Sequence, residues 1–187
     1  MNVYDFDGTI YNGDSSVDFY LYCLRKRPKI ATVFLRQIKG VLYHTVGKIN
    51  TKQMKEQFFS FLPLLDDIDA LVISFWEKHK HKIYPWYLAQ KNQNDVVISA
   101  SPFFLLLPIC TQLGITQLIA TQMDLHSGKI IGNNCKGTEK VRRFYEQFSE
   151  TKIQCFYSDS LADTPLAEIS EKAFLVQKNR LRLWFDS

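Results

Sequence analysis

The sequence lacks the patterns that mark several classes of protein. Its four cysteines, Cys23, Cys110, Cys135 and Cys155, are widely spaced and form no Cys-x-x-Cys pair, which argues against a zinc site. No signal-peptide pattern opens the chain, so we expect reduced thiols in a cytoplasmic protein. The longest uninterrupted apolar run, Pro102 to Cys110, is too short to span a bilayer. Without internal repeats or low-complexity tracts, the chain is expected to be a soluble globular protein.

Acidic residues are almost absent from one stretch of the chain. Between Tyr20 and Ser60 there is one acid, Glu56, against nine basic residues: Arg25, Lys26, Arg27, Lys29, Arg36, Lys39, Lys48, Lys52 and Lys55. Such a cluster attracts anions, which include phosphate substrates, lipid surfaces and nucleic acids. A solvated helix surface is the commoner explanation. No nucleic-acid-binding motif accompanies the cluster, so we expect no nucleic-acid partner, and no obligate protein partner is evident.

The chain is long enough, at 187 residues with 46% hydrophobic content, for one domain with an insertion. After Asp95, short apolar strands alternate with helices: strands are predicted over 95–99, 117–121, 153–157 and 173–176, helices over 102–113, 138–148 and 161–169, and a hairpin around Ser127-Gly128. This alternation predicts an α/β fold with a parallel sheet and helices on both faces. Residues 14–90 show helical patterns instead. We therefore predict a core of residues 1–13 and 91–187 with a helical insertion of residues 14–90.

One helix of the insertion has two interpretations. Between residues 30 and 45, apolar side chains recur at helical spacing, with Arg36 and Lys39 off that stripe: Ile30, Phe34, Ile38, Val41, Leu42 and Thr45. We expect the stripe to form the core of the insertion. The alternative is a basic amphipathic helix that makes peripheral contact with an anionic membrane.

Two carboxylates two residues apart follow the first predicted strand. Side chains at i and i+2 of an extended chain point to the same side, so Asp5 and Asp7 converge, and Gly8 allows a sharp turn after them. Two adjacent acids repel each other unless a cation neutralises them. Mg²⁺ suits this role, because it binds a few carboxylate oxygens together with water and phosphate. An acidic turn after an edge strand is the simpler explanation of the pair alone.

Similar polar residues follow the other strands. They are Ser99 and Ser101 after the second strand and Ser158-Asp159-Ser160 with Asp163 after the third buried strand, while Lys136 and Lys140 flank the start of the intervening helix. Ligands of open parallel sheets bind at the carboxyl ends of the strands. We therefore predict one site for both phosphate and Mg²⁺ at the carboxyl edge of the sheet, built from hydroxyls, acids, a lysine and helix N-termini.

The order of these motifs resembles the haloacid dehalogenase (HAD) superfamily of phosphatases. The four motifs are Asp5-Phe6-Asp7-Gly8-Thr9, Ser99 within Val-Ile-Ser-Ala-Ser-Pro, a lysine within Cys135-Lys136-Gly137-Thr138-Glu139-Lys140-Val141, and Asp159-Ser160-Leu161-Ala162-Asp163. The insertion resembles the cap of the phosphoserine-phosphatase-like branch, subfamily IB. The resemblance implies a Rossmann-like core under an all-helical cap.

The resemblance also implies roles for individual residues. Asp5 would be the nucleophile that forms an aspartyl-phosphate, and Asp7 the general acid and base. Mg²⁺ would be bound by Asp5, by the backbone carbonyl of Asp7 and by Asp159, with Asp163 nearby ordering metal-bound water. The phosphoryl group would be bound by Gly8, Ser99, Ala100 and the lysine of the third motif. The Gly-x-x-Lys-Val setting selects Lys140 as that lysine, and Lys136 is the alternative.

Substrate residues are less defined. Asp14 occupies the place of the acid that binds the substrate amine in phosphoserine phosphatases, although it also suits a helix N-terminus. Arg36 is the candidate for a substrate carboxylate. The expected substrate is a small phosphorylated metabolite.

Three alternative functions stay open from the sequence. The run from Phe19 through Arg25-Lys26-Arg27-Pro28, with Tyr157-Ser158-Asp159-Ser160, also resembles HAD-type phosphatidylglycerophosphate phosphatases, which would make the substrate a lipid phosphate. A phosphotransferase shares the aspartyl-phosphate step. A non-enzymatic polyanion-binding module is the remote alternative, because it would not need both Asp5 and Asp7.

Overall fold

A six-stranded sheet in the order β3-β2-β1-β6-β7-β8 lies at the centre of the computed structural model, which describes residues 1–149, 151–177 and 179–185. The strands are β1 (Asn2–Tyr4), β2 (Val96–Pro102), β3 (Gln117–Thr121), β6 (Ile153–Ser158), β7 (Ser170–Gln177) and β8 (Arg180–Leu183). The first five of these run parallel, and β8 pairs antiparallel with β7. Strand β8 was not predicted, whereas the other strands match the predicted ones closely.

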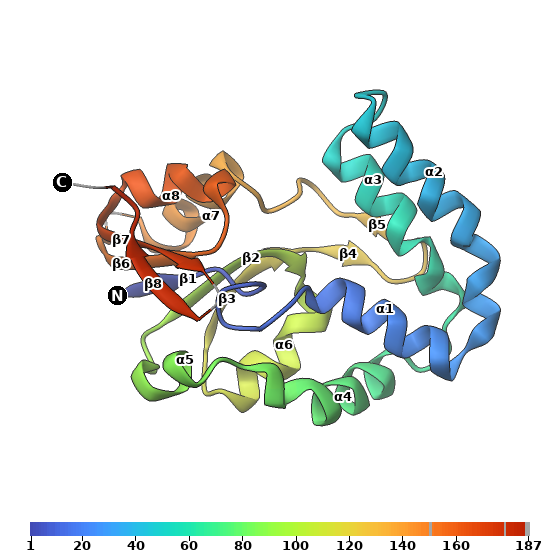
Figure 1. The fold of residues 1–187 in the computed structure, drawn as a ribbon, viewed down its shortest axis with the longest axis horizontal. Helices are drawn as coiled ribbons and strands as arrows, with labels where there is room; N and C mark the ends of the chain where they lie inside the picture. Colours follow the sequence, from blue (N-terminus) through green and yellow to red (C-terminus); the bar gives the residue numbers. More distant parts are fainter. Residues whose placement is uncertain (150, 178, 186–187) are drawn as a thin grey trace.

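Helices cover both faces of the sheet (Figure 1). They are α5 (Pro85–Gln90) and α6 (Phe103–Gln112) on one face, and α7 (Thr138–Phe148) and α8 (Thr164–Glu168) on the other. Consecutive strand residues point to opposite faces: Val97 packs in the cluster that contains the α6 side chains, and its neighbours Val96 and Ile98 pack in the cluster that contains Phe144 of α7. The predicted parallel α/β sheet with helices on both faces is confirmed.

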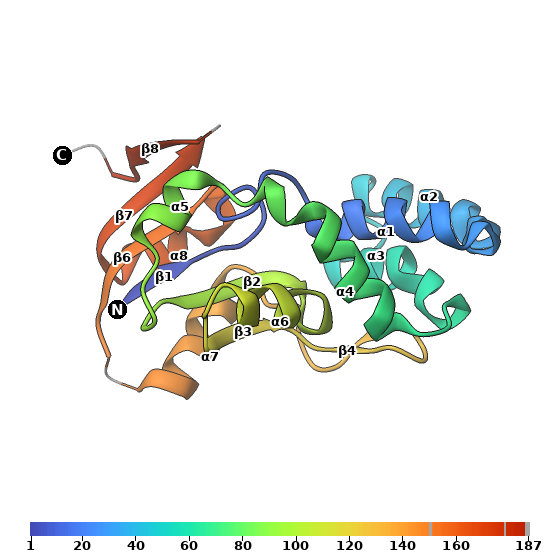
Figure 2. The same ribbon diagram turned by 90° about the horizontal axis from the view of Figure 1, so that it is seen from below.

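Four further helices lie between β1 and β2 in the chain: α1 (Ser15–Lys26), α2 (Phe34–Thr45), α3 (Thr51–Phe58) and α4 (Ile68–His79). Short 3-10 segments follow α1, α3 and α4, at Pro28–Val33, Phe59–Leu64 and Lys80–Lys82, and a fourth, Leu161–Asp163, precedes α8. Asp14 caps α1, and Asn50 caps α3 in a reciprocal capping box with Gln53. Figure 2 shows α1, α2 and α3 at the end of the molecule away from both termini. None of the helices that the structure describes is long and apolar enough to cross a membrane.

One aromatic cluster joins these helices to the sheet. Trp76 of α4 packs against Phe6 and Tyr11, with ring centroids 5.8 and 5.4 Å away, and its indole nitrogen donates to the Leu105 carbonyl of α6 at 2.6 Å. Helix α4 is therefore packed directly on the body of the molecule. The boundaries of the insertion, residues 14–90, stay a prediction.

The predicted hairpin forms between β4 (Met123–Asp124) and β5 (Lys129–Ile130) and extends to the inserted helices. The amide of Ile130 donates to Glu56 of α3 at 3.2 Å. Gly128 has φ +70°, and a Cβ there would lie 2.4 Å from the Phe59 carbonyl oxygen. Glycine at this position allows the hairpin to approach the backbone of the insertion closely.

The prediction that the apolar stripe of residues 30–45 forms the core of the insertion is wrong for every member except Ile30, which is fully buried. The other members, Phe34, Ile38, Val41, Leu42 and Thr45, are exposed. Helix α2 packs on α3 through its polar and small residues instead: Gln37 donates to the Phe58 carbonyl at 2.8 Å, and Gly40 lies against Gln57. Because the face that carries Gln37 and Gly40 packs on α3, the apolar face on the other side of α2 is exposed to solvent.

The ion pair between Asp18 and Lys82 joins α1 to the segment before α5 and makes the stability of the fold depend on pH. Asp18 accepts hydrogen bonds from Lys82 and, at 2.6 Å, from the Tyr11 hydroxyl. Burial raises the pKa of Asp18, but these hydrogen bonds outweigh it and hold the pKa below its ordinary value. A lowered folded-state pKa stabilises the fold above the ordinary pKa of about 4, and this stabilisation is lost as the pH falls through the folded-state value.

We expect Asp18→Asn to lower the free energy of unfolding at neutral pH by about 1–3 kcal/mol, and the difference from wild type to shrink as pH falls to about 3. Urea denaturation at the two pH values measures both. The control is Asp66→Asn, which breaks the exposed Lys29–Asp66 pair and should change stability by less than about 1 kcal/mol. If Asp18→Asn lowers the free energy of unfolding equally at both pH values, the charge of Asp18 contributes nothing to stability.

Candidate active site

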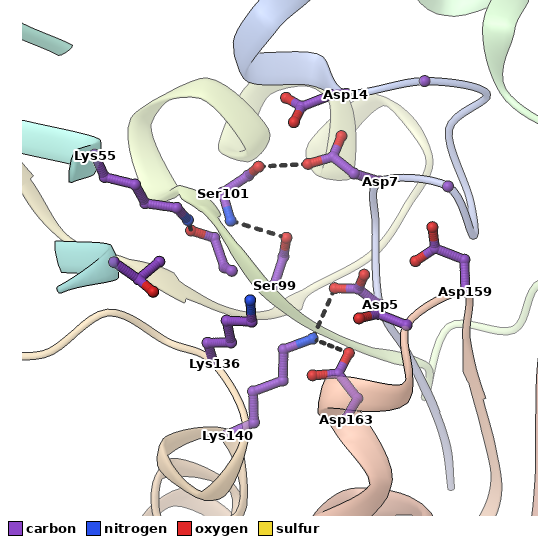
Figure 3. Close-up of a pocket in the computed structure, with 15 residues that line it drawn as sticks. Asp5, Asp7, Asp14, Lys55, Ser99, Ser101, Lys136, Lys140, Asp159 and Asp163 are labelled. Carbon is purple, nitrogen blue, oxygen red and sulfur yellow. Dashed lines mark hydrogen bonds and ion pairs between the residues drawn. The ribbon is translucent and has the colours of Figure 1, made fainter. Parts of the chain in front are cut away.

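A cavity of about 410 Å³ lies at the carboxyl edge of the sheet, where β1, β2 and β6 end (Figure 3). Its lining comes from these strand ends, the start of α1, and helices α3 and α7: Asp5, Asp7, Gly8, Gly13, Asp14, Thr51, Lys55, Ser99, Ala100, Ser101, Lys136, Lys140, Asp159, Ser160 and Asp163. The structure thus brings together the residues selected at the strand ends.

Lys140 lies at the bottom of the cavity between two carboxylates. Its Nζ is 2.8 Å from Asp5 Oδ1 and 2.6 Å from Asp163 Oδ2, and the side chain is buried. Burial lowers the pKa of Lys140, but Asp5 and Asp163 outweigh this and raise it, so the lysine is charged. The Ser158 hydroxyl donates to the same Asp163 oxygen at 2.8 Å. This network fixes the position of Asp5.

Asp7 has different partners from Asp5. Its carboxylate accepts a hydrogen bond from the Ser101 hydroxyl, and one from the Ser15 amide at 2.7 Å. Burial, and next the negative charge of Asp14, raise the pKa of Asp7 to about 7. A carboxyl group with this pKa can both donate and accept a proton near neutral pH.

Gly8 allows Asp159 to approach the first motif. Gly8 has φ +68°, and a Cβ there would lie 2.0 Å from Asp159 Oδ2. The Asp159 amide donates to the Thr9 hydroxyl at 2.9 Å, which holds the loop after β6 against the loop after β1. Burial and the nearby Asp5 raise the pKa of Asp159 to about 6.

The donor set fits a Mg²⁺ ion. Burial also raises the pKa of Asp5, against the opposing charge of Lys140, so three acids facing one cavity are destabilised as carboxylates. A divalent cation would relieve this. No group of three or more His, Cys, Asp or Glu side chains with metal-binding spacing occurs in the described part of the chain. Mg²⁺ needs only one or two carboxylates, because water and phosphate supply its other ligands.

The end of β2 supplies the hydroxyl side of the cavity. Ser99 is buried and its Oγ accepts from the Ser101 amide at 3.1 Å. The Ala100 carbonyl accepts from Lys55 Nζ and from the Thr121 hydroxyl, both at 2.8 Å. Lys136 also lines the cavity, but its side chain is exposed, whereas the Lys140 side chain is buried.

The insertion contributes Asp14 and Lys55 rather than Arg36. Asp14 Oδ1 accepts from the Ser16 and Val17 amides at 2.9 and 3.0 Å, which is the N-cap of α1. Arg36 lies on α2, is exposed and does not line the cavity, because α3 separates α2 from it. Burial lowers the pKa of Lys55 to about 8.

Lys55 belongs to the basic cluster of residues 20–60 but was not among the residues predicted for the site. Its spacing from Thr51 places both residues on one face of α3. Nothing in the sequence showed that this face turns inward. Figure 3 shows Lys55 and Lys136 on one side of the cavity and Asp5, Asp7 and Asp159 on the other.

Comparison with known proteins identifies the family. Residues 3–168 match the haloacid dehalogenase-like hydrolase family. The chain therefore belongs to this family, as its motifs predicted.

A curated relative is Protein CicA of Caulobacter vibrioides, found in two strains, with 32% identity over 155 residues. The match covers 79% of this chain, and the chain spans 63% of the length of that relative.

Solved structures share the fold at lower identity. A protein of unknown function from Bordetella pertussis Tohama I has a TM-score of 0.76 at 20% identity, over 92% of this chain and 87% of that chain. A probable phosphoserine phosphatase from Vibrio cholerae has a TM-score of 0.64 at 12% identity, over 92% and 55% of the two chains. A substrate-bound phosphoserine phosphatase complex has a TM-score of 0.59 at 16% identity, over 91% and 82%.

The close approach of Gly8 and Asp159 gives a prediction for metal binding. In Gly8→Ala the new Cβ must displace the Asp159 carboxylate, so we expect Mg²⁺ affinity to fall by at least about tenfold, measured by titration calorimetry. The matched control is Gly114→Ala, where φ is +76° and nothing lies within 4 Å of the new Cβ. Both variants carry backbone strain of about 1 kcal/mol, but only Gly8→Ala should lose metal affinity. Equal affinities in the two variants would contradict the assignment of Asp159 as a ligand.

Proposed function

We propose that the protein is a Mg²⁺-dependent phosphomonoester hydrolase that acts through an aspartyl-phosphate on Asp5. The observation that carries the proposal is the different environment of two carboxylates at the end of β1. Asp5 is paired with the buried Lys140 at 2.8 Å, while the pKa of Asp7 is raised to about 7 by burial and by Asp14. Two neighbouring acids with separated pKa values suit one nucleophile and one general acid.

In the first step a carboxylate oxygen of Asp5 attacks phosphorus. The new Asp5 O–P bond forms as the P–O bond of the ester breaks, and Asp7 gives its proton to the departing alcohol oxygen. Lys140 stabilises the negative charge of the transferring phosphoryl group. Ser99, Gly8 and Ala100 would lie around the phosphoryl oxygens at the turns after β1 and β2.

In the second step water replaces the enzyme at phosphorus. Asp7, now a carboxylate, removes a proton from the water as its oxygen attacks. The Asp5 O–P bond breaks, which releases inorganic phosphate and regenerates the Asp5 carboxylate and the protonated Asp7. Both steps need Asp7 close to the scissile bond, and the hydrogen bonds from Ser101 and Ser15 support this role because they restrict the Asp7 carboxylate to one position.

The metal would be held by Asp5, the backbone carbonyl of Asp7 and Asp159. When bound, Mg²⁺ supplies positive charge that neutralises the phosphoryl oxygens and the surrounding acids. Asp163 lies beside these residues, and its ion pair with Lys140 gives it the role of orienting the lysine.

Two residues of the insertion favour a substrate with polar groups away from the phosphate. Asp14 Oδ1 caps α1, so we assign Oδ2 to a substrate amine. Lys55 replaces Arg36 as the cation for a substrate carboxylate, because it lines the cavity from α3. This pair supports a phosphoserine-like amino-acid phosphate, and the chain has the fold of phosphoserine phosphatase structures. A cytoplasmic location remains an expectation from the sequence.

A lipid phosphate is the second candidate substrate. The exposed apolar face of α2 favours it, since a lipid phosphate would be reached at a membrane surface. A phosphotransferase differs only in using another acceptor in place of water.

Turnover of a phosphomonoester panel with Mg²⁺ tests the proposal. The panel contains phosphoserine, sugar phosphates, nucleotides and phosphatidylglycerophosphate. We expect phosphate release from at least one member, and a loss of at least about a thousandfold in Asp5→Asn, because the amide is no nucleophile. The folded state of the variant is checked by circular dichroism. Absence of phosphate release across the panel, with Mg²⁺ bound to the wild type, would contradict hydrolysis and leave a transferase.

The role of Lys55 is tested separately by kinetics. We expect Lys55→Met to raise KM for phosphoserine by about tenfold with a small effect on kcat, because a charge-assisted hydrogen bond to the substrate is lost. KM for p-nitrophenyl phosphate, which has no second anionic group, should not change. Lys52→Met is the control, since Lys52 lies on the same helix but reaches the Gly132 carbonyl outside the cavity. Equal increases of KM for both substrates would place Lys55 at the phosphate instead.

A further inference from the structure

Helix α2 exposes a continuous apolar face. The exposed fractions of its large apolar side chains are 52% for Phe34, 80% for Leu35, 40% for Ile38, 49% for Val41 and 57% for Leu42, and Val46 just beyond the helix is 65% exposed. These positions follow the i, i+3, i+4, i+7 spacing of one helix face. Contiguous exposed apolar surface of this kind marks an interaction site.

The position of α2 makes this face accessible. Figures 1 and 2 show α2 at the outer rim of the inserted helices, at the end of the molecule opposite the termini. Its inner face is occupied by α3, through Gln37 and Gly40. The apolar face therefore takes no part in the packing of α2 on α3 and is accessible to a binding partner.

The charges beside this face are mostly positive. Seven basic side chains between residues 25 and 48 are exposed: Arg25, Lys26, Arg27, Lys29, Arg36, Lys39 and Lys48. Within the described part of the chain, Lys29 is the one of these that forms a salt bridge, with Asp66. Glu56, the single acid between Tyr20 and Ser60, accepts a hydrogen bond from β5. Lys39 and Lys48 lie 5.2 and 5.5 Å from the ring centre of Tyr43.

We propose that α2 docks the protein on an anionic membrane surface. The apolar face would enter the boundary between headgroups and acyl chains, and the basic side chains would contact anionic headgroups. The apolar face matches the acyl layer of such a membrane, and the basic side chains around it match the anionic headgroups. The tyrosine between two lysines suits the interface, where aromatic rings with a polar end collect.

A second copy of the chain fits this surface poorly. A symmetric dimer pairs the same patch from both subunits. It would bring the exposed basic side chains of one copy against those of the other, and like charges repel. An anionic lipid surface provides the opposite charge together with an apolar layer.

Docking through α2 would place the cavity close to the membrane. Helix α3 packs directly on α2 and carries Thr51 and Lys55, which line the cavity. The membrane would thus lie one helix away from the catalytic residues. Docking itself needs no turnover, so the proposal stands or falls independently of the phosphatase assignment.

Vesicle co-sedimentation of the full chain tests the proposal. The probes are vesicles of phosphatidylglycerol with phosphatidylcholine, and vesicles of phosphatidylcholine alone. We expect binding to the anionic vesicles that weakens at least about tenfold when salt is raised from about 0.1 to about 0.5 M. Binding to phosphatidylcholine alone should be at least about tenfold weaker.

The decisive variant is Leu35→Gln/Leu42→Gln, which removes apolar surface from two exposed positions. It should lower binding to anionic vesicles by at least about tenfold and keep the wild-type unfolding midpoint. The matched control is Ile73→Gln/Leu107→Gln, which changes two other exposed apolar residues, on α4 and α6, and should bind as wild type does. Size-exclusion chromatography of all three proteins reports self-association.

Three outcomes would overturn the proposal. The first is no binding of the folded wild type to anionic vesicles. The second is binding that Leu35→Gln/Leu42→Gln leaves unchanged. The third is a dimer that this variant abolishes in the absence of vesicle binding, which would assign the face to a second copy of the chain.

Discussion

The acidic edge of the sheet depends on one buried ammonium group. Lys140 is held between Asp5 and Asp163, so a single positive charge offsets two buried carboxylates that would otherwise be costly to ionise. These three residues come from α7, from the end of β1 and from the turn after β6. Their attraction holds these elements together, while Asp7 and Asp159 have further contacts of their own with Ser101, Ser15 and Thr9. The contacts that stabilise this edge are therefore the same contacts that position the residues of the proposed site.

The basic residues of the insertion lie in two different environments, the cavity and the outer surface. Lys55 turns inward and lines the cavity, while the basic side chains around α2 stay in solvent. The division arises because α3 lies between the two, with one face toward the cavity and the other toward α2. A substitution in this cluster can thus affect the cavity or the outer surface without affecting the other.

Periodicity predicted most of the fold, and motif order selected most of the residues that line the cavity, with limits that have physical causes. Strand β2 was predictable because its buried residues form an apolar run, whereas every residue of β8 is exposed and its sequence, Arg-Leu-Arg-Leu, gives no core signal. The spacing in α2 showed which apolar residues share a face. Only the packing of Gln37 and Gly40 on α3 shows that this apolar face points outward. For the same reason the sequence led to Arg36, which lies outside the cavity, and not to Lys55, which lines it, since the number of basic residues does not show which way each side chain points.

The place of β1 in the sheet has a consequence for how the chain folds. Tyr4 is paired with Val97 on one side and with Tyr157 on the other, so the central strand has its hydrogen-bonding partners far away in sequence. During synthesis β1 can complete its pairing only after β6 has been made, and contacts of such separation form slowly. The strand that presents Asp5 is therefore made early and completed late. Until then the sheet beneath the inserted aromatic helices is incomplete, and in this interval the nascent chain exposes an unpaired strand edge that favours aggregation.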